Sequence, residues 1–125
     1  MGLFKKKETP IRFGVPLKEG LTVELLFTGR VYDVAKRLGM TINATPTNGY
    51  DVLTIYADIM YCAAVNFWEL SEEKNDIPFS RIDFHSFYMD NPDGFKQAAK
   101  MSNDAAQRML ADIQELVKSF EKWAK

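Results

Sequence analysis

Residues 50–70 form the longest apolar stretch of the chain, and they constrain its fold more than any other feature. Sixteen of these 21 residues are apolar or aromatic. The five polar members lie close to one line along a helix, and Cys62 lies on the same line between Asp58 and Asn66. They are Asp51, Thr54, Asp58, Asn66 and Glu69. A helix with so narrow a polar stripe is buried on most sides. We therefore expect a central helix that places Met60 and Val65 in the core.

The same stretch does not indicate a membrane span. A spanning helix needs about 20 nearly uninterrupted apolar residues, and Asp51 and Asp58 would be costly inside a bilayer. Residues 1–7 hold three lysines but no apolar run of signal-peptide length. The single cysteine, Cys62, cannot form an internal disulfide, which fits a reducing cytosol. These features predict an intracellular protein that does not contact a membrane.

The chain has 125 residues, the length of one domain, and no Gly/Ser-rich or Pro-rich linker divides it. A folded domain of this size buries about two-thirds of its unfolded surface, enough for a core without disulfides or metals. We expect a single domain with four parts. These are a basic arm over residues 1–10, a hairpin over 11–27, a helical core over 28–103 and a terminal amphipathic helix over 104–125.

Local patterns place the first elements of this domain. Residues 11–15 and the first part of 21–27 alternate between apolar and polar or small side chains, and turn-forming residues separate them. Period-two alternation with that punctuation predicts a β-hairpin. Thr28 then stands where a helix N-cap belongs, and Gly39 stands at the expected C-cap. The sequence therefore predicts a short helix directly after the hairpin.

Two further helix starts follow the central helix. Ser80 and Asp83 form a variant capping box, with aspartate in the usual glutamate place. Asn91 and Pro92 supply an N-cap and a proline at the first helical position. The most periodic segment comes last, at about residues 104–123. The predicted fold class is a mainly α domain built around a central apolar helix, with an N-terminal β-hairpin.

The chain lacks the residue patterns of most enzymes. His85 has Asp83 and Ser86 nearby in sequence, but helix positions one or two residues apart do not face each other. We interpret His85 as structural and Cys62 as a small core residue. The acidic cluster from Glu69 to Asp76 has no EF-hand spacing, and no phosphate-binding or dinucleotide fingerprint occurs. We expect no catalytic residues, no metal site and no cofactor.

Charge gives no reason to expect a nucleic-acid partner, because the net charge is −1. Besides two isoleucines, the stretch over residues 77–89 holds five large aromatic or apolar side chains. They are Phe79, Phe84, Phe87, Tyr88 and Met89. In a domain this small they form core, or else they line a groove for a partner helix. The sequence leaves both interpretations open.

The terminal helix carries the cleanest apolar face of the chain. We call it the terminal stripe and define it as Leu110, Ile113, Val117, Phe120 and Trp123. Such a stripe docks on its own domain, on a second copy of the chain, or on a helix of another protein. We select these five residues as the candidate partner-binding site and keep docking on the chain's own domain as the alternative.

The order of elements, with two short motifs, resembles the phage tail assembly chaperone family of long-tailed phages and prophage elements. The motifs are Lys36-Arg37-Leu38-Gly39 at a helix end and Asp51-Val52-Leu53 at a helix start. A short acidic helix near residues 81–90 and another helix starting at Pro92 follow in the same order. The resemblance covers roughly residues 20–110 and leaves out the basic arm and the long terminal helix.

This resemblance implies a non-enzymatic protein of the host bacterium's cytoplasm. It would bind the apolar, helical tape measure protein and keep it soluble while tail tube subunits polymerise around it. Two alternatives from other classes stay open. One is a small structural protein of a virion or assembly, and the other is a regulatory adaptor that binds a host protein. Self-association into a homo-oligomer is compatible with each of them.

Overall fold

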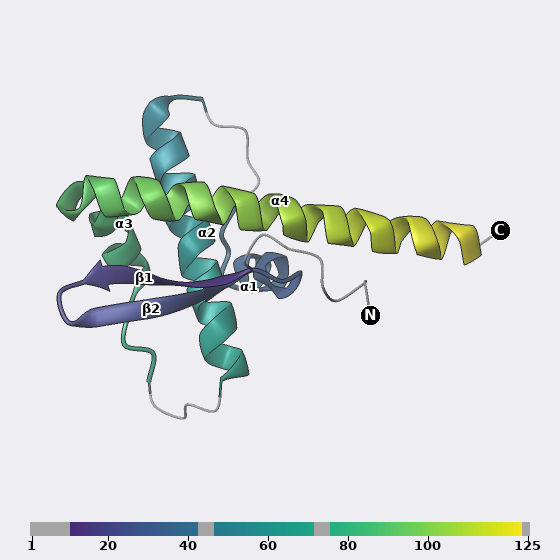
Figure 1. The fold of residues 1–125 in the computed structure, drawn as a ribbon, viewed down its shortest axis with the longest axis horizontal. Coiled ribbons are helices and arrows are strands. Elements are labelled where there is room, and N and C mark those ends of the chain that lie inside the picture. Colours follow the sequence, from purple (N-terminus) through teal and green to yellow (C-terminus); the bar gives the residue numbers. More distant parts are fainter. Residues whose placement is uncertain (1–10, 43–46, 72–75, 124–125) are drawn as a thin grey trace, which may run out of the picture.

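The computed structural model describes residues 11–42, 47–71 and 76–123. Within these residues a two-stranded antiparallel hairpin comes first and four helices follow it (Figure 1). The elements are β1 (Arg12–Lys18), β2 (Leu21–Leu26), α1 (Arg30–Arg37), α2 (Gly49–Leu70), α3 (Arg81–Asp90) and α4 (Pro92–Trp123). The predicted fold class, mainly α with an N-terminal hairpin, is therefore confirmed.

The hairpin follows the alternation that predicted it. Phe13, Val15 and Leu17 are buried, whereas the residues between them are exposed. The strands pair in a register that sets Val15 opposite Val23. Gly20 has a φ of +77°, a left-handed conformation that favours glycine in the turn. One face of the hairpin therefore joins the core.

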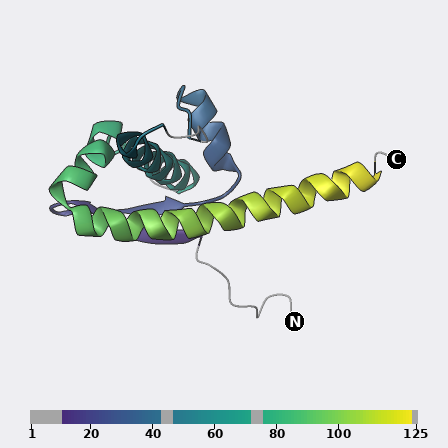
Figure 2. The same ribbon diagram turned by 90° about the horizontal axis from the view of Figure 1, so that it is seen from above.

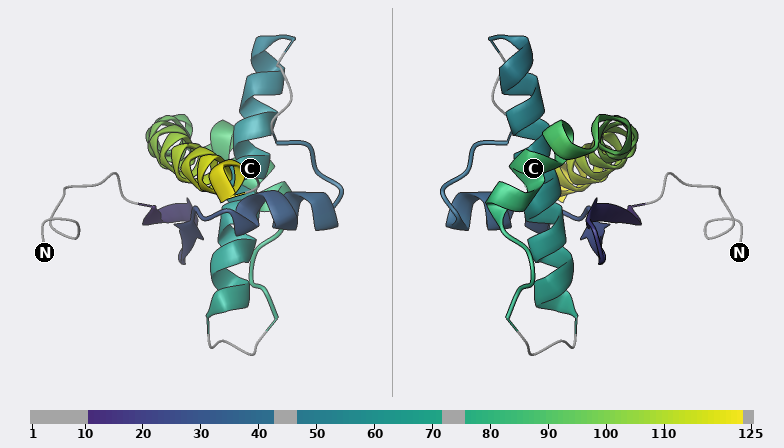
Figure 3. Two further views of the ribbon diagram at one scale, coloured as in Figure 1. Left: turned by 90° about the vertical axis from the view of Figure 1, so that its right-hand side faces the viewer. Right: turned by 90° about the vertical axis from the view of Figure 1, so that its left-hand side faces the viewer.

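Helix α2 is the centre of the fold, as its composition predicted. In Figure 3 it runs through the middle, with α1 extending to one side and the hairpin on another. Met60 and Val65 are both buried, which confirms that expectation. The Asn48 side chain caps the helix by accepting a hydrogen bond from the Asp51 backbone N–H at 2.9 Å. The apolar sides of α2 contact β2, α1, α3 and α4.

The start of α1 differs from the prediction by one residue. We expected Thr28 as the N-cap, but Gly29 holds that place and makes no side-chain cap bond. The Thr28 hydroxyl instead accepts hydrogen bonds from the Arg30 backbone N–H at 3.4 Å and from a buried asparagine of α2. The Thr28 hydroxyl thus serves both the first turn of α1 and a tertiary contact with α2. Gly39 follows the C-cap residue with a φ of +71°, where a glycine was expected to end the helix.

The caps of the last two helices are as predicted, but their extent is not. Ser80 and Asp83 form the capping box of α3. The Asn91 side chain accepts a hydrogen bond from the Gly94 backbone N–H at the start of α4. We expected one helix from Pro92 and another over about 104–123, whereas α4 is one continuous helix of 32 residues. The expected boundary between core and terminal helix at residue 104 falls inside it.

Core stability should depend strongly on Met60, whose side chain has no exposed surface. Met60→Ala should lower the free energy of unfolding by about 2–5 kcal/mol, because it removes buried methylene groups and leaves a cavity. Urea denaturation followed by circular dichroism measures this change. Val52→Ala, on an exposed position of the same helix, is the matched control and should cost less than about 1 kcal/mol. Equal effects of the two variants would contradict the central place of α2.

Candidate functional site

Two buried polar clusters lie on the polar stripe of α2. In the first, Arg81 of α3 donates two hydrogen bonds of 2.8 Å to the buried carboxylate of Asp58. His85, one turn later on α3, lies with its Nε2 2.7 Å from the same carboxylate. Burial raises the pKa of Asp58, but hydrogen bonds from Arg81 and His85 outweigh it, so the pKa is lowered overall. This cluster joins α3 to α2.

His85 is thus paired with a residue that sequence neighbours did not indicate. Asp83 accepts a hydrogen bond from the Ser80 backbone N–H and forms an ion pair with Lys18 of β1. It therefore caps its own helix and contacts the hairpin. The partner of His85 is Asp58, which lies 27 residues earlier. A spacing so long leaves no periodic signal in the sequence.

The second cluster surrounds Asn66, which is wholly buried. Its amide donates to the Leu26 carbonyl at 2.8 Å and to the Thr28 hydroxyl at 3.1 Å. Its carbonyl oxygen accepts from Arg30 at 2.7 Å. Arg30 also donates to Glu69, one turn further along α2. The cluster therefore fixes the junction of β2 and α1 against the second half of α2.

Glu69 completes this cluster at the surface. Arg37 donates two hydrogen bonds of 2.7 Å to it, one to each carboxylate oxygen. These bonds, with the contribution of Arg30, lower the pKa of Glu69. Asp58, Asn66 and Glu69 of the polar stripe are therefore used for tertiary contacts that hold neighbouring elements in place.

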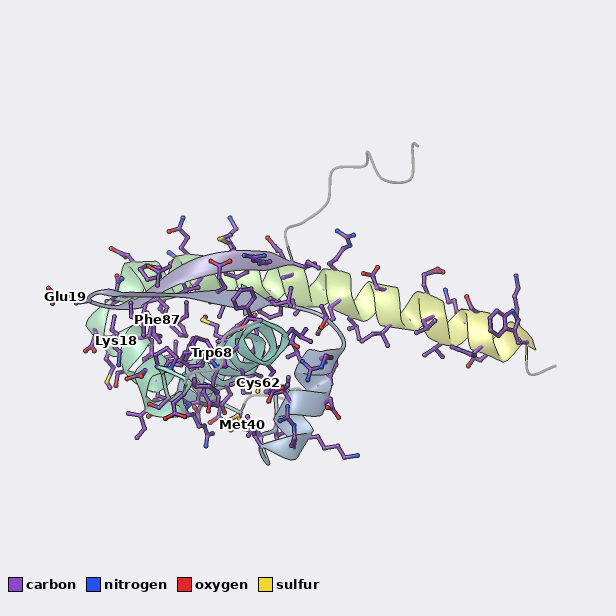
Figure 4. The ribbon with its side chains drawn as sticks, turned by 90° about the horizontal axis from the view of Figure 1, so that it is seen from below. Lys18, Glu19, Met40, Cys62, Trp68 and Phe87 are labelled. Carbon is purple, nitrogen blue, oxygen red and sulfur yellow. The ribbon has the colours of Figure 1, made fainter. Side chains whose placement is uncertain are left out.

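The remaining candidate nucleophile lies in the core. Cys62 is buried, and burial raises the pKa of its thiol to about 12. A thiol at that pKa is protonated near neutral pH and does not act as a nucleophile. Figure 4 places Cys62 close to Met40, and their sulfur atoms are 3.7 Å apart. Among the described residues, no group of three His, Cys, Asp or Glu side chains is arranged to hold a metal ion.

Most of the aromatic residues over 77–89 belong to the core. Phe79, Phe84 and Phe87 are buried, and edge-to-face contacts connect them to neighbouring rings. These three side chains face α2 and α4, so they do not line a groove for a partner helix. Met89 is exposed, and Tyr88 is half-buried.

A shallow cavity of about 430 Å³ lies on the outer side of α3. Exposed side chains at its rim include Tyr50, Ile82 and Met89, and Arg81 and His85 also line it. It is therefore a second exposed apolar surface, next to the Asp58 cluster.

Most of the terminal stripe has no covering element among the described residues. Figures 1 and 2 show α4 extending past the other elements toward its C-terminal end. All ten residues from 114 to 123 are exposed. The exposed fraction is 48% for Val117, 55% for Phe120 and 75% for Trp123. Phe120 and Trp123 contact each other edge to face, with ring centroids 5.1 Å apart.

The structure divides the five residues predicted to bind a partner. Ile113 is half-buried and packs against the core, so docking on the chain's own domain holds for that residue. Leu110 borders a groove of about 180 Å³ beside Phe27 and Val31. The last three residues of the stripe contact no other element of the described structure. Leu116, which the prediction left out, is also exposed beside them.

The described part of the chain contains no helix that is long and apolar enough to span a membrane. Comparison of the chain with protein-family models, curated proteins and solved structures found no match. The function proposed for this protein therefore rests on its exposed surfaces.

The Asp58 cluster should make stability depend on pH. Because the pKa of Asp58 is lowered in the folded state, its ion pair stabilises the fold at neutral pH, and that stabilisation is lost as the pH falls through about 4 and below. Asp58→Asn should therefore cost about 1–3 kcal/mol at pH 7, and its difference from wild type should narrow in acid. Urea denaturation at pH 7 and pH 3 measures both quantities.

Asp90→Asn is the control for this prediction, because Asp90 is an exposed aspartate at the end of α3. It should change the free energy of unfolding by less than about 0.5 kcal/mol at pH 7. A difference between wild type and Asp58→Asn that stays constant from pH 7 to pH 3 would contradict the role given to the ion pair.

Proposed function

We propose that this protein is a non-enzymatic assembly chaperone that holds an apolar, helical client on its terminal stripe. The observation that carries the proposal is the exposure of Val117, Phe120 and Trp123 on a helix that extends beyond its own domain. Large apolar side chains gathered on one exposed face mark binding surfaces more often than scattered ones do.

The spacing of these residues suits a helical client. Ile113, Val117 and Phe120 recur at steps of four and three, and Leu116 and Trp123 widen the face. Helix-binding surfaces use anchors at this spacing. Two helices packed along such faces bury their apolar side chains between them and leave the charged faces in water. A client helix must therefore carry an apolar face of its own.

The biological assignment follows from the resemblance to phage tail assembly chaperones. We propose that the client is the tape measure protein and that binding keeps it soluble in the cytoplasm of the host bacterium while tail tube protein assembles around it. The gene should then lie between those for the tail tube and the tape measure proteins. A chaperone should also be absent from the finished particle, whereas a structural protein of the virion would remain in it.

The proposal is tested by producing the chain together with the tape measure protein of the same genome. The wild-type protein should keep the tape measure protein soluble and co-purify with it. Val117→Glu and Phe120→Glu should each reduce the co-purified amount at least about tenfold, because a charge enters the apolar interface. Both variants should change the free energy of unfolding by less than about 1 kcal/mol, because these side chains are exposed.

Ala111→Glu serves as the matched control, because it adds the same charge to the opposite side of the same helix. It should retain full client binding. Retained binding by both Val117→Glu and Phe120→Glu would show that the terminal stripe is not the client site. Unfolding of these variants would instead show that the stripe supports the core.

A further inference from the structure

The terminal stripe continues the face that α4 buries on its own domain. Phe120 lies five helical turns after Ser102, and Trp123 lies five turns after Ala105, so each pair shares one line along the helix. Ser102 and Ala105 are buried, whereas Phe120 and Trp123 are exposed. The domain therefore stops covering this face partway along α4, and Ile113, which is half-buried, marks the boundary. A segment that covers the rest has to start near Ile113.

Strand β1 reaches the same region from the opposite direction. It packs beside the first half of α4, and both elements border a shallow cavity whose lining includes Gly94 and Met101. Figure 1 shows β1 running against the direction of α4, so the chain enters β1 on the side where α4 leaves the domain. Just before β1, the Ile11 carbonyl accepts a hydrogen bond of 2.7 Å from the backbone N–H of Phe27, which borders a groove with Met109. The chain before Ile11 therefore starts beside the last covered turns of α4.

We propose that the basic arm, residues 1–10, packs along the exposed half of α4 and covers one edge of the terminal stripe. The arm lies outside the described residues, and it joins them at Ile11. Pro10 restricts the residue before it to extended conformations, which favours an arm that continues in line with β1. That line follows α4 toward its C-terminal end.

The length of the arm fits this path. An extended residue advances about 3.3 Å and a helical residue about 1.5 Å, so each arm residue passes about two residues of α4. Among the residues that line the shared cavity, Phe13 is the first of β1 and Met101 is the last of α4, and the antiparallel directions set them at the same level. Counted from there, the three lysines of the arm reach the level of about residues 114–119 of α4, and the two apolar residues before them reach about residue 122.

The charges on this side of α4 match those of the arm. Glu115 lies about four turns after Met101, and Asp112 lies about four turns after Ala98, so both carboxylates are on the side that packs beside β1. Asp112 lies 3.8 Å from Arg108, whereas Glu115 forms no ion pair with another described residue. The three lysines come within side-chain reach of these two acidic groups. Ion pairs between exposed side chains are weak singly, so they set the register of the arm while apolar contact supplies most of its stability.

Apolar side chains meet further along the same path. Leu116 is exposed and lies five turns after Ala98, which lines the cavity beside β1. Trp123 lies on the same side of the helix and is also exposed. In the proposed path, Leu3 and Phe4 reach these two side chains. The contact removes apolar surface from water on both segments, and this burial holds the arm in place.

The arm competes with a client helix for the end of the stripe. This consequence rests on the proposed function, whereas the contact itself requires no client. Val117 lies about 100° around the helix from Leu116, on the edge of the stripe that the arm leaves open. A client helix can therefore dock at Val117 first and then displace the arm from Trp123. The arm thus shields an exposed aromatic side chain of the stripe until a client arrives.

Nuclear magnetic resonance on the full chain tests the contact through its two tryptophan indole signals. Phe4→Ala should shift the indole N–H signal of Trp123, because it removes an aromatic ring packed nearby. The Trp68 signal should not move, because Trp68 packs against Phe79 inside the domain. A Trp123 signal that is the same in wild type and Phe4→Ala overturns the proposal. So does a wild-type signal that moves to the Phe4→Ala position on dilution, because the contact would then join two chains.

Charge reversal tests the path of the arm. Lys6→Glu combined with Lys7→Glu should move the Trp123 signal in the same direction as removal of the aromatic ring does, because the acidic side of α4 then repels the arm. Adding Asp112→Lys and Glu115→Lys should restore the wild-type position of the signal.

Gln107→Lys combined with Gln114→Lys is the matched control, since it adds lysines to the far side of the same exposed helix. It should not restore the signal. Rescue that is absent with the acidic pair, or equal for the two pairs, overturns the proposed path.

Client binding separates this proposal from the proposed function. Phe4→Ala should tighten client binding at least about threefold, because it raises the fraction of chains whose stripe is open. A chain that binds no client but whose Trp123 signal responds as expected would contradict the proposed function alone. A chain that binds the client on the terminal stripe but whose Trp123 signal does not respond would contradict the arm contact alone.

Discussion

The fold depends on satisfying the polar groups of a helix that is otherwise buried on most sides. Asn66 shows the constraint most clearly, because its amide is wholly enclosed and would destabilise the protein by about 1–3 kcal/mol if left without hydrogen bonds. Its partners, the Leu26 carbonyl, the Thr28 hydroxyl and Arg30, all come from the junction of β2 and α1. The position of that junction on α2 is therefore set by hydrogen bonding as well as by packing.

The same constraint applies two turns earlier on α2. Asp58 is buried, and a carboxylate there is tolerated because Arg81 and His85 pair with it. Both partners belong to α3, so the charge determines which side of α2 that helix covers. The apolar sides of α2 pack against the same elements and against α4. Helix α2 thus positions its neighbours through both polar and apolar contacts.

The two halves of helix α4 differ in what they contact. Its first half buries Phe95, Ala98 and Met109 against the domain, whereas its second half extends into solvent. A helix can continue in this way because its backbone hydrogen bonds are internal. The apolar side chains of this second half stay exposed, because burying them requires another surface. Val117, Phe120 and Trp123 consequently remain exposed, and this exposure is what supports a binding surface in the proposed function.

Periodicity and capping chemistry predicted the local elements of this protein well. Asn91 and Pro92 marked the start of α4, Ser80 and Asp83 marked α3, and the apolar run marked α2 with Met60 and Val65 inside. These signals are local, because caps and helix faces involve residues a few positions apart. At Thr28 the predicted cap is displaced by one residue, and its hydroxyl combines a bond to the first turn of α1 with a contact to α2 that no local pattern indicates.

The candidate site was predicted only in part. The sequence determined that residues 110–123 form an amphipathic helix, because its spacing fixes which side chains share a face. It did not determine how much of that face the domain covers. Only the tertiary structure decided that Ile113 packs on the core while Val117 and Phe120 do not. It likewise decided that Asp58 meets His85, since contacts between distant segments arise from packing and leave no periodic pattern in the chain.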